Sequence, residues 1–297
     1  MRCTLAPIFA GILVALACSG VQADTPAKTL EGFSNPESVL IDGPRRFVSN
    51  LGAKLDPTGH DGDGFISELD AGGRIVALRA FPADGETLDA PKGMALADGR
   101  LYVADIDRIV GFDVSSRRKV FEARVPAGGP SLLNDLASVP EGLAVTDTLR
   151  GTVYRVDLGT GAFTSVASGI PGANGIAWDA RGNRLLVVGL GARFEGGDLF
   201  EVTVDGQVRK LDRGPHGILD GLVLLRDERM LLSDWRSFDP PAPGVLSLHA
   251  GDGTELARLS LPRDVHGPAD FAVDAAAGAV WVPVMREGTV LVAPLVQ

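Results

Sequence analysis

One sequence motif recurs six times along the chain of 297 residues and constrains its fold more than any other feature. In each copy a polar residue stands directly before an apolar run, which is followed by a turn and further apolar strands. The six copies begin with Pro36-Glu37-Ser38-Val39, Pro91-Lys92-Gly93-Met94, Leu133-Asn134-Asp135-Leu136, Ala173-Asn174-Gly175-Ile176, Leu219-Asp220-Gly221-Leu222 and Ala269-Asp270-Phe271-Ala272. Their polar residues are separated by 55, 42, 40, 46 and 50 residues. Units of this length built from short strands are typical of propeller blades, so the sequence predicts an all-β fold, a six-bladed β-propeller.

The apolar clusters between the turns are short, as at residues 100–105 and 184–189, and Gly, Pro, Asp or Asn bound them. The chain contains 38 Gly and 19 Pro, which requires frequent turns, and no long stretch shows helical apolar spacing. The longest interval between copies contains an insert rich in Gly and Asp at residues 52–64. We expect residues 25–33 to supply a strand that pairs with the last blade, because closing the ring removes exposed sheet edges.

The first 23 residues predict a secretory signal peptide. Arg2 precedes an apolar run at residues 5–18, and small residues stand before a cleavage site ahead of Asp24. The expected organisation is therefore a signal peptide at residues 1–23 and a single propeller domain at residues 24–297, exported to the periplasm or secreted. The alternative is a lipoprotein acylated at Cys18. Both cysteines of the chain lie in this segment, so the mature domain is expected to contain no disulfide.

The composition excludes two classes of partner. The chain has 28 Lys and Arg against 38 Asp and Glu, a net charge of -10, which argues against nucleic acid. After the signal segment no apolar stretch is long enough to span a membrane. A small-molecule substrate is the expected partner, and the sequence leaves the oligomeric state open.

The polar residue of each repeat is the main candidate for function. The innermost strand of every propeller blade faces the central channel, so residues at the same phase of the repeat form a ring around one axis. This predicted ring consists of Glu37, Lys92, Asn134, Asn174, Asp220 and Asp270. The structural alternative is that these residues are turn residues that cap the strand starts.

Charge balance in the ring predicts a bound cation. Three carboxylates around a narrow channel repel one another, and Lys92 compensates only one of them. A divalent cation with hard oxygen ligands, Ca²⁺, Mg²⁺ or Mn²⁺, would compensate the rest. Protonation of one or two of the acids is the alternative.

The motifs of the ring resemble those of the senescence-marker-protein, gluconolactonase and regucalcin-like family. Its members are six-bladed propellers with one divalent ion in the channel, and Glu37, Asn174-Gly175 and Asp220-Gly221 match the family motifs of blades 1, 4 and 5. The substrate-contacting Asn-Asp of blade 3 is matched by Asn134-Asp135. The resemblance implies that Glu37, Asn174 and Asp220 ligate the ion, with Ca²⁺ as the expected ion. It also implies hydrolysis of a lactone or small ester, with Asp220 as general base.

Lys92 is not part of the family pattern. It opposes metal binding, pairs with Asp270, or holds an anionic group of the substrate. We expect Lys92, Asn134 and Asp270 to contact the substrate. His216 and His266 join this predicted substrate-binding set because each stands four residues before an aspartate of the ring, which places both on loops that enter the same face of the channel. The alternative for both is a loop histidine that is hydrogen-bonded to backbone.

Three functions follow from these patterns. The leading one is the metal-dependent hydrolase, and the second is a non-catalytic propeller that binds a small ligand or a protein and in which Lys92 replaces the charge of the metal. The third is a lyase or strictosidine-synthase-like propeller. The chain lacks motifs of serine hydrolases, nucleotide-binding loops and zinc proteases. Polar residues also recur at the ends of second strands, and we predict structural roles for Asn50, Asp105, Asp147 and Asp234.

Overall fold

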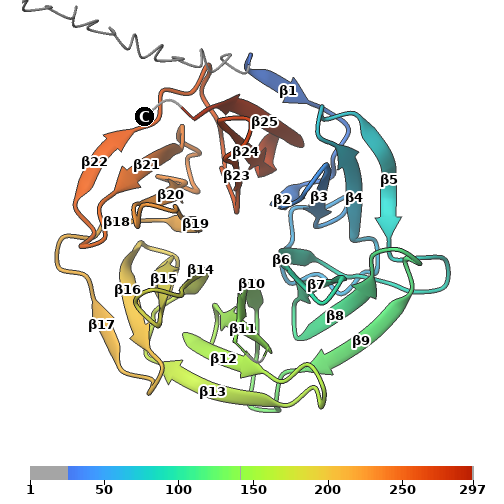
Figure 1. The fold of residues 1–297 in the computed structure, drawn as a ribbon, viewed down its shortest axis with the longest axis horizontal. Helices are drawn as coiled ribbons and strands as arrows, with labels where there is room; N and C mark the ends of the chain where they lie inside the picture. Colours follow the sequence, from blue (N-terminus) through green and yellow to red (C-terminus); the bar gives the residue numbers. More distant parts are fainter. Residues whose placement is uncertain (1–25, 141, 296–297) are drawn as a thin grey trace, which may run out of the picture.

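Six antiparallel sheets surround a central axis in the computed structural model, which describes residues 26–140 and 142–295 (Figure 1). The described part is all-β apart from one short 3-10 helix, η1 (Met285–Glu287). The predicted six-bladed β-propeller is confirmed.

The predicted signal peptide and Cys18 lie outside the described residues and stay predictions. No helix of the described ranges has the length and apolar character that crossing a membrane requires.

Each blade is one sheet whose strands follow one another along the chain. Blades 1 to 3 contain β2 (Pro36–Asp42), β3 (Arg45–Asn50), β4 (Phe65–Asp70) and β5 (Ile75–Phe81); β6 (Pro91–Ala97), β7 (Arg100–Asp105), β8 (Arg108–Asp113) and β9 (Lys119–Arg124); and β10 (Leu133–Val139), β11 (Gly142–Asp147), β12 (Thr152–Val156) and β13 (Phe163–Ser168). Blades 4 to 6 contain β14 (Ala173–Asp179), β15 (Arg184–Gly189), β16 (Gly197–Thr203), β17 (Val208–Lys210) and β18 (His216–Gly217); β19 (Leu219–Leu224), β20 (Met230–Asp234), β21 (Val245–His249) and β22 (Glu255–Arg258); and β23 (Ala272–Asp274), β24 (Ala279–Val284), β25 (Thr289–Pro294) and β1 (Lys28–Leu30).

The first strand of each blade is innermost, as Figure 1 shows for β2, β6, β10, β14 and β19. In these five strands the pairing with the second strand is interrupted at the same place, directly after the first residue of the strand. The ring residue occupies this irregularity. A bulge leaves its residue outside the ladder and turns its side chain away from the regular pleat.

Blade 6 departs from this pattern. Its inner strand β23 begins only at Ala272, so Asp270 lies before the strand. The backbone of Asp270 is bonded to blade 1 instead: its N–H donates to the carbonyl oxygen of Glu37 (3.0 Å), and its own carbonyl oxygen accepts from the N–H of Val39 (3.2 Å). Asp270 therefore forms part of the junction between the first and last blades.

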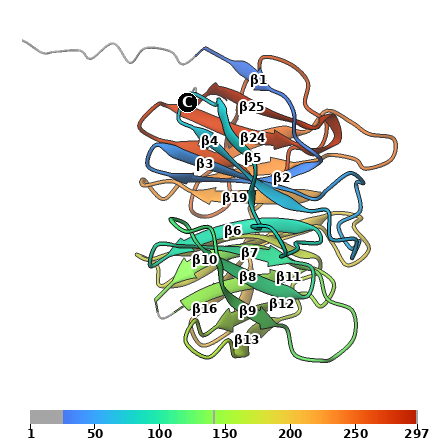
Figure 2. The ribbon, with the colours of Figure 1, turned by 90° about the vertical axis from the view of Figure 1, so that its right-hand side faces the viewer.

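The ring is closed by a strand from the start of the described chain. β1 pairs antiparallel with β25, with Lys28 opposite Val292, and Figure 2 shows the two strands side by side. This confirms the strand expected within residues 25–33. Apolar side chains fill the space between neighbouring blades, as where Phe81 packs against Phe47 and Phe112 with ring centroids 6.0 and 5.2 Å apart.

The polar residues at the ends of second strands hold the starts of the inner strands. Each accepts a hydrogen bond from a backbone N–H that lies just before an inner strand, at 2.8–3.1 Å. The four pairs are Asn50 with Ser34, Asp105 with Ala90, Asp147 with Leu132, and Asp234 with Ile218. The predicted structural roles of these residues are confirmed.

We predict that Asp105→Ala lowers the free energy of unfolding by about 3 kcal/mol, because Asp105 is fully buried and its loss leaves the buried guanidinium of Arg108 without its closest carboxylate. Urea denaturation measures this change. Asp107→Ala in the same hairpin is the control, since Asp107 forms only an exposed ion pair with Arg124 and its loss is expected to cost less than about 1 kcal/mol. Equal losses of unfolding free energy in the two variants would contradict the structural role of Asp105.

Candidate functional site

A cavity of about 260 Å³ lies where the inner strands begin. Five of the six predicted ring residues line it, one from each of blades 1 to 5: Glu37, Lys92, Asn134, Asn174 and Asp220. All five are buried, with no more than 6% of any of them exposed. Because these residues occupy the same position in each repeat, the fold brings together side chains that are up to 183 residues apart in the chain.

Four oxygen atoms in this cavity have no hydrogen-bond partner among the described residues. They are Oε2 of Glu37, Oδ1 of Asn134, Oδ1 of Asn174 and Oδ1 of Asp220. An unpaired buried acceptor costs about 1–3 kcal/mol, so these four oxygens are expected to bind groups that enter the cavity, such as a cation, a ligand or water. All four are hard acceptors, and a hard divalent cation is a partner that carboxylate and amide oxygens ligate together.

The donor set is mixed. No group of three or more His, Cys, Asp or Glu side chains within residues 26–140 and 142–295 is arranged to hold a metal ion. The four unpaired oxygens belong to only two carboxylates, with two amides beside them. Such a set fits Ca²⁺ or Mg²⁺ better than a metal that prefers thiolate or imidazole ligands.

Burial and mutual repulsion disfavour the charged forms of the carboxylates. Burial raises the pKa of Glu37 well above its usual value, the charges of Asp220 and Asp270 raise it further, and Lys92 opposes this. Burial also raises the pKa of Asp220 to about 7, against the hydrogen bond that its Oδ2 accepts from Nε1 of Trp235 (2.7 Å). The site therefore carries acidic groups that a bound cation would return to their ionised form.

Lys92 is an isolated ammonium group. Its Nζ donates to the carbonyl oxygen of Ala90 (2.8 Å), and burial lowers its pKa to about 8, although Glu37 opposes this shift. None of the ion pairs among the described residues includes Lys92, and Asp270 is not among the charges that act on it, so the ion pair between Lys92 and Asp270 is not formed. The carboxylate of Asp270 instead accepts a hydrogen bond from the hydroxyl of Ser38.

Three predicted substrate-binding residues do not line the cavity: Asp270, His216 and His266. His216 lies in the short strand β18 and not in a loop as we expected, because β18 pairs with β16; this pairing brings Nδ1 of His216 to 3.0 Å from Oδ1 of Asp198. Nδ1 of His266 lies 3.1 Å from Oε1 of Glu287. The binding roles of the three residues stay predictions.

Asp135, the second residue of the matched Asn-Asp motif, also lies outside the cavity lining. Its two carboxylate oxygens accept hydrogen bonds from the backbone N–H groups of Leu136 (2.7 Å) and Ile176 (2.8 Å). Because Ile176 belongs to the next inner strand, Asp135 ties blade 3 to blade 4. These two hydrogen bonds account for a buried aspartate at position 135, and contact with a substrate is not needed to explain it.

Sequence reasoning missed the walls of the cavity. Above the ring residues, the lining consists of Leu51, Leu55, Pro57, Leu132, Leu190, Phe194, Trp235, Phe238, Met285 and Arg286. Four of these directly follow the second strand of their blade: Leu51, Leu190, Trp235 and Met285. The repeat phase therefore places these four residues near the ring, but it does not distinguish a side chain that packs in the core from one that faces the cavity. The predicted insert at residues 52–64 contributes Leu55 and Pro57.

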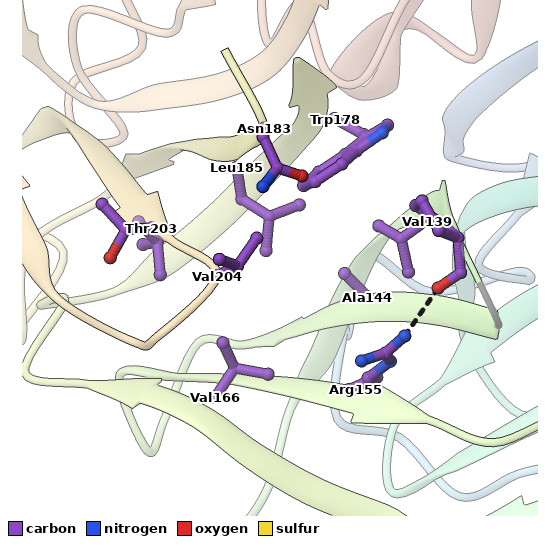
Figure 3. Close-up of a pocket in the computed structure, with 11 residues that line it drawn as sticks. Val139, Ala144, Arg155, Val166, Trp178, Asn183, Leu185, Thr203 and Val204 are labelled. Atoms are coloured by element: carbon purple, nitrogen blue, oxygen red, sulfur yellow. Dashed lines mark hydrogen bonds between the residues drawn. The ribbon is translucent and has the colours of Figure 1, made fainter. Parts of the chain in front are cut away.

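A second, smaller hollow of about 140 Å³ lies between blades 3 and 4, at the far ends of the inner strands β10 and β14 (Figure 3). Its walls are mainly apolar, with Val139, Trp178 and Val204 among them. Nη2 of Arg155 donates to the carbonyl oxygen of Pro140 (2.7 Å) at its edge. None of the predicted site residues lines this hollow, so the channel cavity is the candidate site.

No protein-family model matches the chain, and no curated protein matches it. Solved structures do resemble it. One is regucalcin from Agrobacterium tumefaciens, described as a calcium-binding protein, with a TM-score of 0.63 and 18% identity over 87% of this chain and 89% of that chain. Another is a catalytically inactive virginiamycin B lyase from Staphylococcus aureus with quinupristin, with a TM-score of 0.59 and 13% identity over 91% of this chain and 100% of that chain.

Hydrazine synthase from Kuenenia stuttgartiensis is also similar, with a TM-score of 0.60 and 13% identity over 92% of this chain and 79% of that chain. At 13–18% identity these likenesses show the fold alone. The chain has a six-bladed propeller fold that is similar to that of regucalcin.

Proposed function

We propose that the protein is an exported hydrolase of a small lactone or ester that uses one divalent cation, with Ca²⁺ as the expected ion. The observation that carries this proposal is the set of four unpaired buried oxygens from four different blades in one cavity. The calcium-binding description of the regucalcin neighbour supports the choice of ion.

Glu37, Asn174 and Asp220 would hold the ion, and Asn134 would reach the ion or the substrate through water. A bound divalent cation supplies Lewis acidity that polarises the carbonyl group of a lactone. In this proposal Asp220 acts as general base. Its Oδ2 accepts the hydrogen bond of the Trp235 indole, so both roles fall to Oδ1: one lone pair of this oxygen would bind the ion, and the other would accept a proton from water. The oxygen of that water then bonds to the carbonyl carbon, the ester C–O bond breaks, and the leaving alkoxide oxygen takes the proton from Asp220, which regenerates the base.

In this proposal Lys92 orients the substrate. Its ammonium group has three N–H donors, and the carbonyl of Ala90 accepts one of them. The other donors can bond the carbonyl oxygen or an anionic group of the substrate from within the same cavity. This is the third of the roles that the sequence left open for Lys92.

Metal analysis of the purified protein tests the proposal. We expect about one equivalent of Ca²⁺, Mg²⁺ or Mn²⁺ per chain, and its loss in both Glu37→Gln and Asp220→Asn. Asp227→Asn is the matched control, because Asp227 is an exposed carboxylate outside the cavity that bonds Arg229. A metal-free wild-type protein that shows no hydrolysis of lactones when Ca²⁺ is added would contradict the proposal.

A second candidate function is a non-catalytic propeller that binds a small ligand or a protein, and the isolated ammonium of Lys92 favours it. In this case Lys92 takes the place of the cation and neutralises the ring. We then expect EDTA to leave the Tm unchanged and Lys92→Met to lower it. Thermal denaturation with and without EDTA separates the two candidates, since the first requires a clear fall in Tm when the ion is removed.

A further inference from the structure

The walls of the channel cavity are apolar above its polar base. Five leucine and methionine side chains and three aromatic ones surround the entrance to the ring residues: Leu51, Leu55, Leu132, Leu190, Met285, Phe194, Trp235 and Phe238. The indole of Trp235 packs edge-to-face on the ring of Phe238, with centroids 5.0 Å apart. A molecule whose reactive end reaches Asp220 therefore places its remaining part against hydrocarbon.

Only two of the wall residues carry polar side-chain groups, Trp235 and Arg286. Nε1 of Trp235 donates to Asp220, and Nη2 of Arg286 donates to the carbonyl oxygen of Phe238 (2.9 Å). The guanidinium of Arg286 also lies over the ring of Trp235, 5.7 Å from its centroid. A sugar lactone would bury several hydroxyl groups here, and each hydroxyl without a partner costs about 1–3 kcal/mol. The walls therefore disfavour polyhydroxylated substrates.

Two apolar residues at the rim remain exposed to water. Leu55 is 42% exposed and Phe194 is 39% exposed, although both line the cavity. Phe194 has a positive φ of 62°, a backbone conformation that is strained for a bulky side chain. Strained backbone and exposed apolar area at the mouth of a cavity are features of surfaces that a ligand covers.

We propose that this site takes a lactone or ester with an apolar substituent, such as an alkyl chain, and discriminates against sugar lactones. This inference rests on the proposed function and names its substrate class. The carbonyl end lies at the ring residues, and the alkyl part lies between the walls and beneath Leu55 and Phe194. Each additional methylene group that enters the cavity adds apolar burial, until the volume of about 260 Å³ is filled.

The test compares γ-butyrolactone, γ-hexalactone, γ-octalactone and glucono-δ-lactone as substrates of the protein with Ca²⁺. We expect kcat/KM to rise about fourfold per added methylene group, which corresponds to the transfer of that group from water into an apolar site. Glucono-δ-lactone is expected to be the poorest substrate. An equal or better kcat/KM for glucono-δ-lactone, or no dependence on chain length, would overturn the inference.

Substitutions at the rim test whether the dependence of kcat/KM on chain length comes from these walls. Leu55→Asn and Phe194→Asn are expected to reduce the gain per methylene group to about twofold or less; Asn tolerates the backbone conformation at position 194, so folding is preserved. Leu256→Asn is the matched control, since Leu256 is 52% exposed on β22 and does not line the cavity. Rim variants that keep the full fourfold gain would contradict the assignment of the walls.

A binding measurement separates this inference from the proposed function. Cyclopentanone and 2-pentylcyclopentanone contain no ester bond, and calorimetry measures their Kd without hydrolysis. Tighter binding of the pentyl compound, by at least tenfold, supports the apolar site even if no lactone is hydrolysed, in which case only the proposed function fails. Equal binding of the two ketones, or no binding, overturns the inference even if lactones are hydrolysed.

Discussion

Asp220→Asn is expected to lower kcat/KM for an alkyl lactone by about 10³-fold, the largest effect of any single substitution in this protein. The substitution removes the group that accepts the proton of water, a contribution of about 10²–10⁴ in other enzymes. It also removes one of the two carboxylates in the set of unpaired oxygens. The shape is retained, because the Asn side chain can still accept the hydrogen bond of Trp235. Initial-rate kinetics with added Ca²⁺ measure the loss.

The interpretation of that loss depends on two comparisons. Asp227→Asn changes the same group outside the cavity and is expected to keep kcat/KM within about twofold of the wild type. The Tm of Asp220→Asn is expected to equal or exceed that of the wild type without cation, since a buried charge has been removed. Activity of Asp220→Asn within tenfold of the wild type would exclude Asp220 as the general base.

The second large effect concerns stability. Without a cation, the free energy of unfolding is expected to fall as the pH rises from about 4 to about 7. The pKa of Asp220 is raised to about 7 in the folded protein by burial, and that of an unfolded aspartate is about 3.9. Between these values the folded protein binds more protons than the unfolded chain, so raising the pH favours unfolding. The expected loss is on the order of 3 kcal/mol for Asp220, with a further loss from Glu37 in the same direction.

Urea denaturation in EDTA at pH 5 and pH 7.5 measures this dependence. Saturating Ca²⁺ is expected to weaken or reverse it, because the ion binds the ionised carboxylates of the folded protein. Asp220→Asn is expected to flatten the curve in EDTA, since the shifted group is absent. If the free energy of unfolding of the wild type in EDTA rises between pH 5 and pH 7.5, the pKa values of Asp220 and Glu37 are not raised in the folded protein.

The fold could be predicted because repeat phase is visible in a single sequence. The openings at Pro36 and Pro91 and at the next three blades coincide with the first residues of the inner strands. The sixth opening was misplaced for a physical reason. Asp270 bonds blade 1 through its backbone and Ser38 through its side chain, so the strand begins only at Ala272.

The site could be predicted only in part. The position of a residue within the repeat predicts whether it lies on the ring. For a residue between two inner strands, it predicts neither how far the side chain lies from the ring nor in which direction it points. His216 and His266 share the same offset from a ring aspartate, yet each lies beside a carboxylate outside the cavity lining. The apolar walls were missed because a leucine after a strand looks the same whether it packs in the core or faces a ligand.

The pairing of β1 with β25 sets the order in which this molecule can be completed. Val292 follows its partner Lys28 by 264 residues, and at ordinary translation rates of about 5–20 residues per second it is synthesised about 13–50 s later. Blades 1 to 5 contain only local strand pairs and can form as the chain lengthens. Blade 6 alone must wait for contact between distant segments. Substitutions in residues 28–30 will therefore act mainly on the last step of folding, the closure of the ring, and not on the blades that precede it.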